Sequence, residues 1–223
     1  IADHGPEWPD KEWPFSHVYI GELIEDNILW RKVSDNPSFY HDASFGDING
    51  DGLIDVVGGH MGTRNGNGDN PHLYYGLNNG EFEEAVNVLP NPPEGGCCGD
   101  VEVYDLNQNG ENEIIRIGGS VNREVMDALE YNSETESFDI VFSLEKDIPE
   151  NYVNTAYTNL KLTSFNDESY YRGYMPSNNR FKDFNGDGLI DFINEKDGLT
   201  IWYNNGNMQF SPFRLNKQAE DNT

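Results

Sequence analysis

The sequence predicts an all-β protein built from a repeated unit of four short strands, and three observations lead to this expectation. An acidic nine-residue signature begins at residues 47, 105 and 183. Each copy is followed by short apolar runs that alternate with polar residues and end in Asn/Gly or Asn/Ser turns, which is typical of hairpins. No apolar period of 3.6 residues is sustained along the 223 residues, so helices are not expected.

The acidic signature separates the first two strands of each unit. The first copy, DINGDGLID, spans residues 47–55 and leads into a β-branched run at residues 56–57. The third copy, DFNGDGLID, spans residues 183–191 and is almost identical. The middle copy, DLNQNGENE at residues 105–113, is weaker.

The third and fourth strands follow each signature as a hairpin. The third strands are expected at residues 72–75, 128–131 and 199–203, and the fourth at residues 81–86, 137–142 and 208–210. One unit therefore has four short strands with a polar loop between the first two, which is the outline of a propeller blade.

The repeats divide the chain into approximate blades of one β-propeller. Their expected ranges are residues 1–35, which form a partial blade, and residues 36–92, 93–150 and 151–223. The spacing of the signatures places an insertion within residues 148–179. About four blades lie at the lower limit for a propeller. Either they close into a small ring or, as we favour, the chain is a segment whose partner is the remainder of a larger propeller.

The acidic signature has the donor pattern of a calcium loop. Oxygen side chains at positions 1, 3, 5 and 9, a carbonyl at position 7 and glycine at position 6 suit a turn around a hard cation. An all-oxygen, partly neutral donor set favours calcium over magnesium, zinc or copper. Gly52 and Gly188 are expected to have positive φ. The predicted ligands of the two strong sites are Asp47, Asn49, Asp51, Leu53 and Asp55, and Asp183, Asn185, Asp187, Leu189 and Asp191.

The middle loop is expected to bind calcium more weakly. Its predicted ligands are Asp105, Asn107, Asn109, Glu111 and Glu113. Asn109 replaces the acid at position 5, and Glu113 is a longer acid at position 9. The alternative to a calcium site, for any single copy of the signature, is an Asx-rich turn that binds no metal. An EF-hand or dockerin is excluded, because position 12 is Gly58 or Asn194 and β-rich sequence follows.

The expected role of calcium is structural. It would neutralise the carboxylates of each loop and hold the turn between the first two strands. The substitutions Asp55→Ala and Asp191→Ala are accordingly expected to lower the melting temperature in calcium and to leave it unchanged in EDTA.

These residues resemble the FG-GAP or VCBS repeats of integrin-like β-propellers. The resemblance rests on FGDINGDG at residues 45–52, VYDLN at 103–107 and FKDFNGDG at 181–188, and it covers most of the chain. It implies a secreted or cell-surface propeller, with calcium loops on one face and the loops after the second strands on the opposite face. The family serves adhesion, lectin-type binding, scaffolding and enzyme-associated roles, so the resemblance alone does not specify a function.

The loops expected on the opposite face carry residues that suit sugar recognition. Aromatic rings stack on the apolar faces of sugars, and Arg, Asn and Asp bond to hydroxyl groups. The candidate ligand-binding residues are Trp8, Trp13, Tyr40, His60, Arg64, Tyr171 and Tyr174. The alternative for each aromatic residue is that it packs its own loop onto the blade. We therefore expect an extracellular recognition module whose ligand is a glycan.

Two other classes of function remain open. A lyase-like enzyme acting on polysaccharides would need a base and a cation beside a uronate, and the candidates are His60, Arg64, Tyr171 and Arg172. No Ser/His/Asp order, nucleophile elbow or phosphate loop accompanies them, so binding is favoured over catalysis. The other class is an adhesion or scaffold subunit that binds an extracellular protein.

Charge and cysteine content narrow the partners further. The chain has 40 Asp+Glu and 14 Lys+Arg residues, a formal net charge of −26. Such a surface repels phosphate backbones, so nucleic acid is not expected as a partner. Membrane insertion is not expected either, because no apolar stretch approaches the roughly 20 residues of a span. The adjacent Cys97 and Cys98 form a vicinal disulfide in an oxidising compartment or remain thiols.

Overall fold

The computed structural model describes residues 17–38, 40–60, 70–92, 100–120, 123–147, 180–194 and 200–214. These residues form strands and turns only, which confirms the predicted all-β class. The strands are β1 (Tyr19–Ile24), β2 (Asn27–Lys32), β3 (Tyr40–Gly46), β4 (Asp55–His60), β5 (His72–Gly76), β6 (Phe82–Ala85), β7 (Asp100–Tyr104), β8 (Glu113–Ser120), β9 (Arg123–Asn132), β10 (Ser137–Asp147), β11 (Arg180–Lys182), β12 (Asp191–Asn194), β13 (Thr200–Asn204) and β14 (Phe210–Arg214).

The strands form three four-stranded antiparallel sheets and one two-stranded sheet. Strands β3–β6 make blade 1, β7–β10 make blade 2, and β11–β14 make blade 3, each in sequential order. Strands β1 and β2 pair only with each other and are called the hairpin. In each blade an acidic signature connects the first strand to the second. This is the propeller-blade arrangement that the repeats predict.

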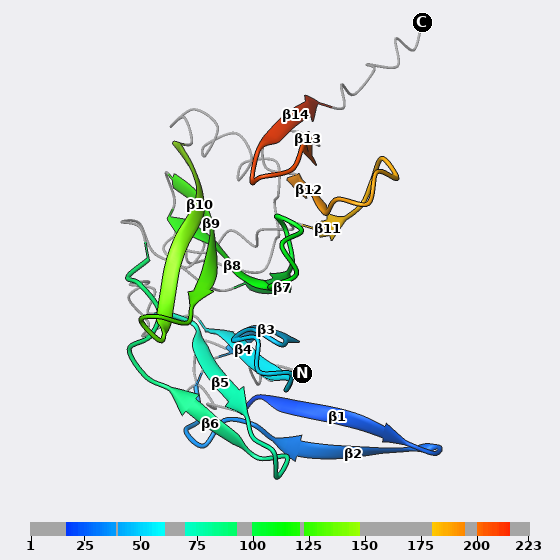
Figure 1. The fold of residues 1–223 in the computed structure, drawn as a ribbon, viewed down its shortest axis with the longest axis vertical. Coiled ribbons are helices and arrows are strands. Elements are labelled where there is room, and N and C mark those ends of the chain that lie inside the picture. The colour runs from blue at the N-terminus through cyan, green and yellow to red at the C-terminus, as the bar shows by residue number, and fades with distance from the viewer. Residues whose placement is uncertain are drawn as a thin grey trace, which may run out of the picture.

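The hairpin and the three blades follow one another along an open arc (Figure 1). The first strands, β3, β7 and β11, lie toward the inside of the arc, and the last strands, β6, β10 and β14, lie outside. The hairpin and blade 3 are at its two ends. The hairpin falls within residues 1–35, and each blade falls within one of the other three ranges expected from the repeats. The insertion expected within residues 148–179 lies outside the described residues.

Blades 1 and 2 each pack on their neighbours through both faces. Because consecutive residues of a strand point to opposite faces, Val56 of β4 packs toward the hairpin and Val57 packs toward blade 2. In β8, Ile114 packs toward blade 1 and Ile115 toward blade 3. A fully buried residue of this size contributes roughly 1.5–3 kcal/mol, so the seams between blades supply much of the stability.

A buried ion pair adds a polar connection to the seam between blades 1 and 2. Arg116 of β8 is 1% exposed, and its Nε donates to Asp127 of β9 at 2.8 Å. Its Nη1 donates to the side chain of Asn70 and, at 2.7 Å, to the carbonyl of Pro90. The guanidinium therefore holds two connecting segments of blade 1 against blade 2. Within the described ranges no helix is long and apolar enough to cross a membrane.

Candidate functional site

The first acidic loop, residues 47–55, is closed by hydrogen bonds from its own backbone. Asp47 Oδ1 accepts from the Gly50 N–H at 2.9 Å, and Asp47 Oδ2 accepts from the Gly52 N–H at 3.0 Å. Asp51 Oδ1 accepts from the Leu53 N–H at 2.8 Å. Gly52 has φ +85°, as expected from the sequence, and Gly50 has φ +77°. The loop thus holds its carboxylates in a tight turn.

Asp55, at position 9 of this loop, connects the loop to the third strand. It is fully buried, and its Oδ2 accepts from the N–H groups of Ile48 at 2.9 Å and Asn49 at 3.3 Å. Its Oδ1 accepts from the Gly76 N–H of β5 at 2.9 Å. A side chain on Gly76 would collide with the Ile54 carbonyl, so only glycine lets β5 lie this close to the loop. Burial raises the pKa of Asp55, and its three N–H donors oppose that rise.

The third acidic loop, residues 183–191, repeats this geometry. Asp183 Oδ1 accepts from Gly186 N–H at 2.6 Å, and Asp183 Oδ2 accepts from Gly188 N–H at 2.9 Å. The Gly188 N–H is the main cause of the lowered pKa of Asp183. The buried Asp191 accepts from the N–H of Phe184 and from that of Asn204 in β13, both at 2.8 Å. In both strong signatures the buried aspartate at position 9 therefore joins its loop to the third strand; we call this contact the clamp.

The middle loop, residues 105–113, is built differently. The buried Glu113 accepts from the Leu106 N–H at 2.7 Å and from Asn107 Nδ2 at 2.8 Å. Glu130 of β9 also enters this loop, and its Oε2 accepts from Nδ2 of both Asn107 and Asn109, each at 2.8 Å. Burial is the main cause that raises the pKa of Glu113 to about 8, and neighbouring Glu130 raises it further.

Glu130 is a site residue that the sequence analysis missed. Its carboxylate lies where the loop has an asparagine instead of an acid at position 5. The signal was present in the repeats, because the equivalent positions in the third strands of blades 1 and 3 are Tyr75 and Tyr203. An acid that replaces an aromatic residue at a repeated position marks a local change of environment.

The three acidic loops are joined to one another along the arc. Asn112 Nδ2 donates to the Asp47 carbonyl at 2.8 Å, which connects the middle loop to the first. Gln108 Nε2 donates to the Gly188 carbonyl at 2.7 Å, which connects the middle loop to the third. Asn204 Nδ2 donates to the Leu106 carbonyl at 2.8 Å and reinforces the second connection. The loops therefore form one continuous polar rim.

All fifteen predicted calcium ligands lie in the described residues, in the three loops where they were expected. Asp51 and Asp187 are exposed, Asp47 and Asp183 are half-buried, and each of these carboxylates has lone pairs beyond those used by backbone N–H groups. The all-oxygen donor chemistry fits calcium. In the described part of the chain, however, no group of three or more His, Cys, Asp or Glu side chains is placed to hold a metal ion. Amide and carbonyl oxygens would have to complete each set.

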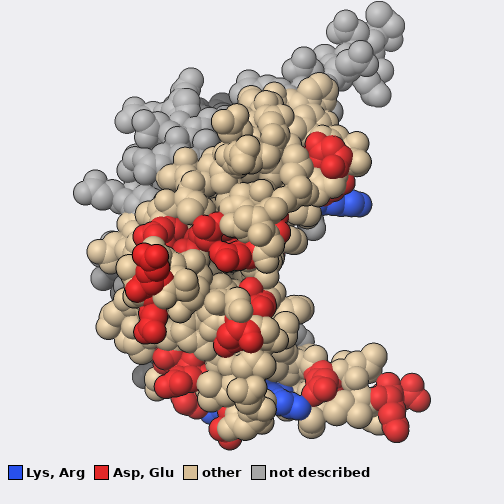
Figure 2. Space-filling model, in the orientation of Figure 1, with Lys and Arg blue, Asp and Glu red and all other residues tan. Residues whose placement is uncertain are grey.

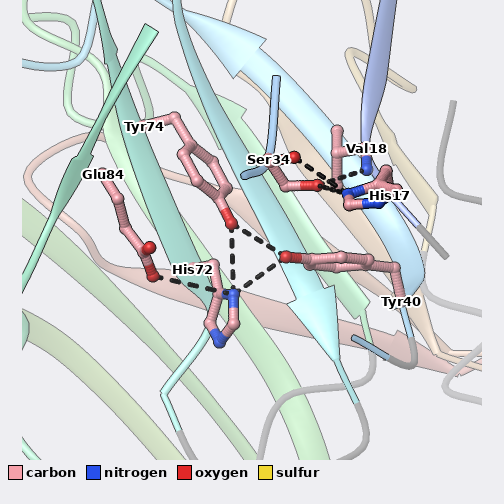
Figure 3. A network of polar contacts seen from close by, with 7 residues as sticks. All are labelled: His17, Val18, Ser34, Tyr40, His72, Tyr74 and Glu84. Atoms are coloured by element: carbon pink, nitrogen blue, oxygen red, sulfur yellow. Dashed lines mark hydrogen bonds and ion pairs between the residues drawn. The ribbon is translucent and has the colours of Figure 1, made fainter. Parts of the chain in front are cut away.

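A buried polar network lies at the junction of the hairpin and blade 1 (Figure 3). The Tyr40 hydroxyl contacts His72 Nδ1 at 2.9 Å and the Tyr74 hydroxyl at 2.8 Å. His72 Nδ1 also lies 3.9 Å from a carboxylate oxygen of Glu84. Burial raises the pKa of Tyr40 and of Tyr74, so both hydroxyls stay neutral at physiological pH. The network orders the starts of β3 and β5.

Tyr40 was predicted as a ligand-binding residue, but its ring offers no exposed face for stacking. The residue is 0% exposed, and it packs with Tyr74 and Val18 in the hairpin seam. The other candidates for ligand binding or catalysis lie outside the described residues, except that the backbone of His60 ends β4. Those outside are Trp8, Trp13, Arg64, Tyr171, Arg172 and Tyr174, and the Cys97–Cys98 pair lies outside as well.

An open groove lies beside the first acidic loop, a place that the sequence analysis did not predict. The groove has a volume of about 320 Å³ and lies between the hairpin and blade 1. Ile20, Ile54 and Phe82 give it apolar walls, and Arg31 crosses it to bond with Glu22 at 2.8 Å. The salt bridge between Arg31 and Glu22 is exposed, so the groove is a shallow surface feature.

Acidic side chains also gather on the inner strands. Figure 2 shows Asp and Glu spread over the middle of the molecule, with few Lys or Arg on the same face. Burial is the main cause that raises the pKa of Glu102 on β7 to about 7, and the charges of Asp42 and Asp100 add to the rise. Asp42 accepts a hydrogen bond from the Val101 N–H at 3.2 Å, across the seam between blades 1 and 2. This seam therefore contains neighbouring acids, and burial raises the pKa of both Asp42 and Glu102.

Comparison with known proteins identifies the repeat. The family model described as FG-GAP-like repeat matches residues 47–115, which include the first and middle acidic loops and the seam between blades 1 and 2. No curated protein and no solved structure gives a significant match. Repeats of this family are typical of extracellular proteins. The match, together with four-stranded blades that each carry such a signature between the first two strands, supports an FG-GAP-like repeat of the β-propeller type in this part of the chain.

Proposed function

We propose that this chain is an extracellular, calcium-stabilised β-propeller module that recognises a glycan. The observation that carries the proposal is the repeated acidic loop. In two copies the buried carboxylate at position 9, Asp55 or Asp191, accepts hydrogen bonds from the backbone of its loop and of the third strand. The carboxylates at positions 1 and 5 of both copies remain available to a cation. A module of this kind keeps its loops in place for recognition rather than for chemistry.

Calcium would act on the rim formed by the three loops. Asp47, Asn49, Asp51 and the Leu53 carbonyl are the groups that would hold it in the first loop, with the equivalent residues in the third. A bound divalent cation offsets like-charge repulsion in a chain with a formal net charge of −26. Because the loops are joined through Gln108 and Asn112, neutralising one loop would also stabilise its neighbour.

The glycan proposal places the ligand at the opposite end of the blades. Its support is the content of the loops that leave this end, where Trp, Tyr, Arg and His residues suit stacking and hydroxyl recognition. A second support is the network of Tyr40, His72 and Tyr74, which holds the starts of β3 and β5 on either side of β4. Loops that leave a rigid base bind with a smaller loss of conformational entropy.

The calcium part is tested by isothermal titration calorimetry and thermal melting of the full chain with calcium or EDTA. We expect Asp51→Asn and Asp187→Asn to weaken calcium binding at least about tenfold, because each removes an exposed ligand charge and keeps an acceptor oxygen for the turn. The matched control is Glu134→Gln, an exposed acid outside the loops. Absence of calcium heat in the unmodified chain, or equal binding by all four proteins, would overturn the calcium proposal.

The glycan part is tested by size-exclusion chromatography of neutral and uronate-bearing polysaccharides after incubation with the chain in calcium. Co-elution of intact polymer with the protein supports the proposal, and Trp8→Ala and Trp13→Ala should then abolish it. Conversion of polymer to small fragments would instead identify an enzyme, with His60, Arg64, Tyr171 and Arg172 as the residues to replace. Polymers that elute unchanged and alone would favour a protein partner.

A further inference from the structure

The two seams between blades are bonded differently at the end where the acidic loops lie. In the seam between blades 2 and 3, Gln108 Nε2 donates to the Gly188 carbonyl at 2.7 Å, and Asn204 Nδ2 donates to the Leu106 carbonyl at 2.8 Å. Gln108 is at position 4 of the middle signature, and Asn204 ends β13. Two side-chain amides therefore cross this end of the seam and bond to carbonyl oxygens on the other side.

The seam between blades 1 and 2 has neither of these amides. Position 4 of the first signature is Gly50, and Tyr131 of β9 stands where β13 has Asn204, as the strand registers show. Gly50 has φ +77°, and nothing lies within 4 Å of the place that its Cβ would take. Asn112, at position 8, joins these two loops instead. This seam is therefore open at the place that Gln108 takes in the next seam.

A recess of about 70 Å³ lies at this open end, and we call it the seam recess. Its lining residues are Ile48, Asn49 and Gly50 of the first loop and Glu111, Tyr131 and Ser133 of blade 2. One water molecule takes up roughly 30 Å³ in the liquid, so the recess has room for an ion together with a water. It is separate from the groove between the hairpin and blade 1.

Glu111 brings a negative charge to the seam recess. It is at position 7 of its signature, where the first and third copies have Leu53 and Leu189. Its backbone N–H donates to Asn109 at 2.8 Å, but among the described residues its carboxylate takes part in no hydrogen bond or ion pair. Position 7 of a calcium loop binds through its backbone carbonyl, so the middle loop does not need this side chain. The carboxylate is therefore available to a ligand in the recess.

A buried hydroxyl lies at the same end of this seam. Tyr75 of β5 and Tyr131 of β9 pack on one apolar cluster, which joins blade 1 to blade 2. The Tyr75 hydroxyl is buried and has no hydrogen-bond partner in the part of the chain that the structure describes. Burial is the main cause that raises the pKa of Tyr75, and neighbouring Tyr131, Asp55 and Asp51 raise it further. Buried hydroxyls are normally bonded to protein, water or a ligand, so this one points to a polar occupant nearby.

We propose that the seam recess binds one hard cation, calcium, between blades 1 and 2. The oxygen groups that its lining residues offer are the Glu111 carboxylate, the Ser133 hydroxyl and the backbone carbonyls of residues 48–50, and waters complete the set. The cation takes the part that the Gln108 amide has in the next seam, because it gives oxygen atoms of two blades a common positive partner. With one carboxylate among neutral oxygens, the dissociation constant should be about 0.1–1 mM.

The seam recess lies between two loops and not within the turn of one, so its cation is independent of the calcium proposed for the loops. The double variant Asp51→Asn with Asp187→Asn, which we call the background, lowers calcium binding by the two strong loops. Isothermal titration calorimetry of the full-length background should still show weak calcium binding. Absence of calcium heat in the background would overturn the inference. The proposed function is judged separately, by the heat lost between the unmodified chain and the background.

Two further changes, each made in the background, locate the cation. Glu111→Gln removes the charge and keeps the backbone carbonyl at position 7. Gly50→Gln gives the first loop the side chain that the middle loop has at position 4, where Gln108 adopts φ +59°. Each change should raise the dissociation constant for calcium at least about tenfold. The matched control is Gly186→Gln, the same change at position 4 of the third signature, which should leave this constant unchanged.

The outcomes separate the seam recess from the middle loop, which also contains Glu111. If Glu111→Gln weakens binding and Gly50→Gln does not, the carboxylate acts in its own loop and the inference is wrong. It is also wrong if Gly186→Gln weakens binding as much as Gly50→Gln does.

Folding and stability give a second readout. Circular dichroism shows whether each variant is folded. If Gly50→Gln is not, Ser133→Lys takes its place, because it changes an exposed turn residue and brings an ammonium group to the recess beside Glu111. Calcium should raise the melting temperature of the background more than that of the variant with the filled recess. An equal rise in both would contradict a cation in the seam recess.

Discussion

Blades 1 and 2 carry the same signature, yet they use its ninth position differently. In blade 1 the short carboxylate of Asp55 reaches from the loop to the backbone of the third strand at Gly76. In blade 2 the longer Glu113 stays within its loop and lies beside a second acid, Glu130. One extra methylene group has converted a clamp across the sheet into a pair of neighbouring acids.

A repeated signature therefore does not give each copy the same role. The carboxylate of Asp55 in blade 1 accepts from three backbone N–H groups. In blade 2, Glu130 adds to the rise in the pKa of Glu113, so we expect a cation to change this loop more. Four sets of variants test this difference between blades 1 and 2.

The largest effect is expected for Asp55→Ala. The substitution leaves the N–H groups of Ile48, Asn49 and Gly76 without their acceptor, and each unpaired buried group costs about 1–3 kcal/mol. We expect the free energy of unfolding to fall by about 3 kcal/mol or more in urea titrations, in EDTA as well as in calcium. The sequence-based expectation of no change in EDTA is therefore replaced. A loss seen only in calcium would show that the clamp needs the metal.

The next effect is expected for Glu102→Gln, since blade 1 has Ser44 at the equivalent position. The pKa of Glu102 is raised to about 7 in the folded chain, so the unfolded chain loses this proton at lower pH and folding stability falls as pH rises toward 7. The glutamine variant should therefore be more stable than the unmodified chain above pH 7, by about 1–2 kcal/mol after allowance for solvent screening. The difference should shrink toward pH 4.5. Thermal melting across this range checks it, and a constant difference would contradict it.

A smaller effect is expected for Asn109→Asp, which gives the middle loop the acid of the outer loops at position 5. The change replaces the hydrogen bond from Asn109 to Glu130 by repulsion between two carboxylates. We expect a loss of about 1 kcal/mol in EDTA and its recovery in calcium, measured by thermal melting. The double variant Asn109→Asp with Glu130→Gln should lose less in EDTA. Equal losses would show that the two side chains do not interact.

The smallest effect is expected at Gln108, where blade 1 has Gly50. Gln108 has φ +59°, a conformation that favours glycine, and its side chain bonds to the Gly188 carbonyl. Gln108→Gly relieves the backbone and loses the bond, so its net change should be below about 1 kcal/mol. Gln108→Ala loses the bond and keeps the strain, so it should be less stable than the glycine variant by about 1 kcal/mol. Urea titration of both variants separates the two contributions.

Much of the fold was predictable because its signals are local. Asn/Gly turns and alternating residues predicted the hairpins of every blade, and Gly52 has the positive φ that the loop requires. The acidic loops lie where the signature predicted them, between first and second strands. These features depend on contacts between residues that are close in the sequence, and such contacts leave a pattern in it.

Much of the site was not predictable because its contacts are distant in the sequence. Glu130 enters a loop that ends at residue 113, and Gln108 bonds to a residue of the next blade. Tyr40 looked like a stacking platform, but it is buried by the hairpin at its seam with blade 1. Burial of this kind depends on which face of a strand meets a neighbour, and a single sequence does not contain that information.

The repeat, the four-stranded unit and the oxygen-rich loops can be read from the sequence, because a loop of nine residues and its flanking hairpin fold on local turn chemistry. What each copy does depends on the packing of one blade on the next. That packing sets which side chains are buried and which acids meet. Those outcomes follow from the seams, and a seam exists only when two units are in contact.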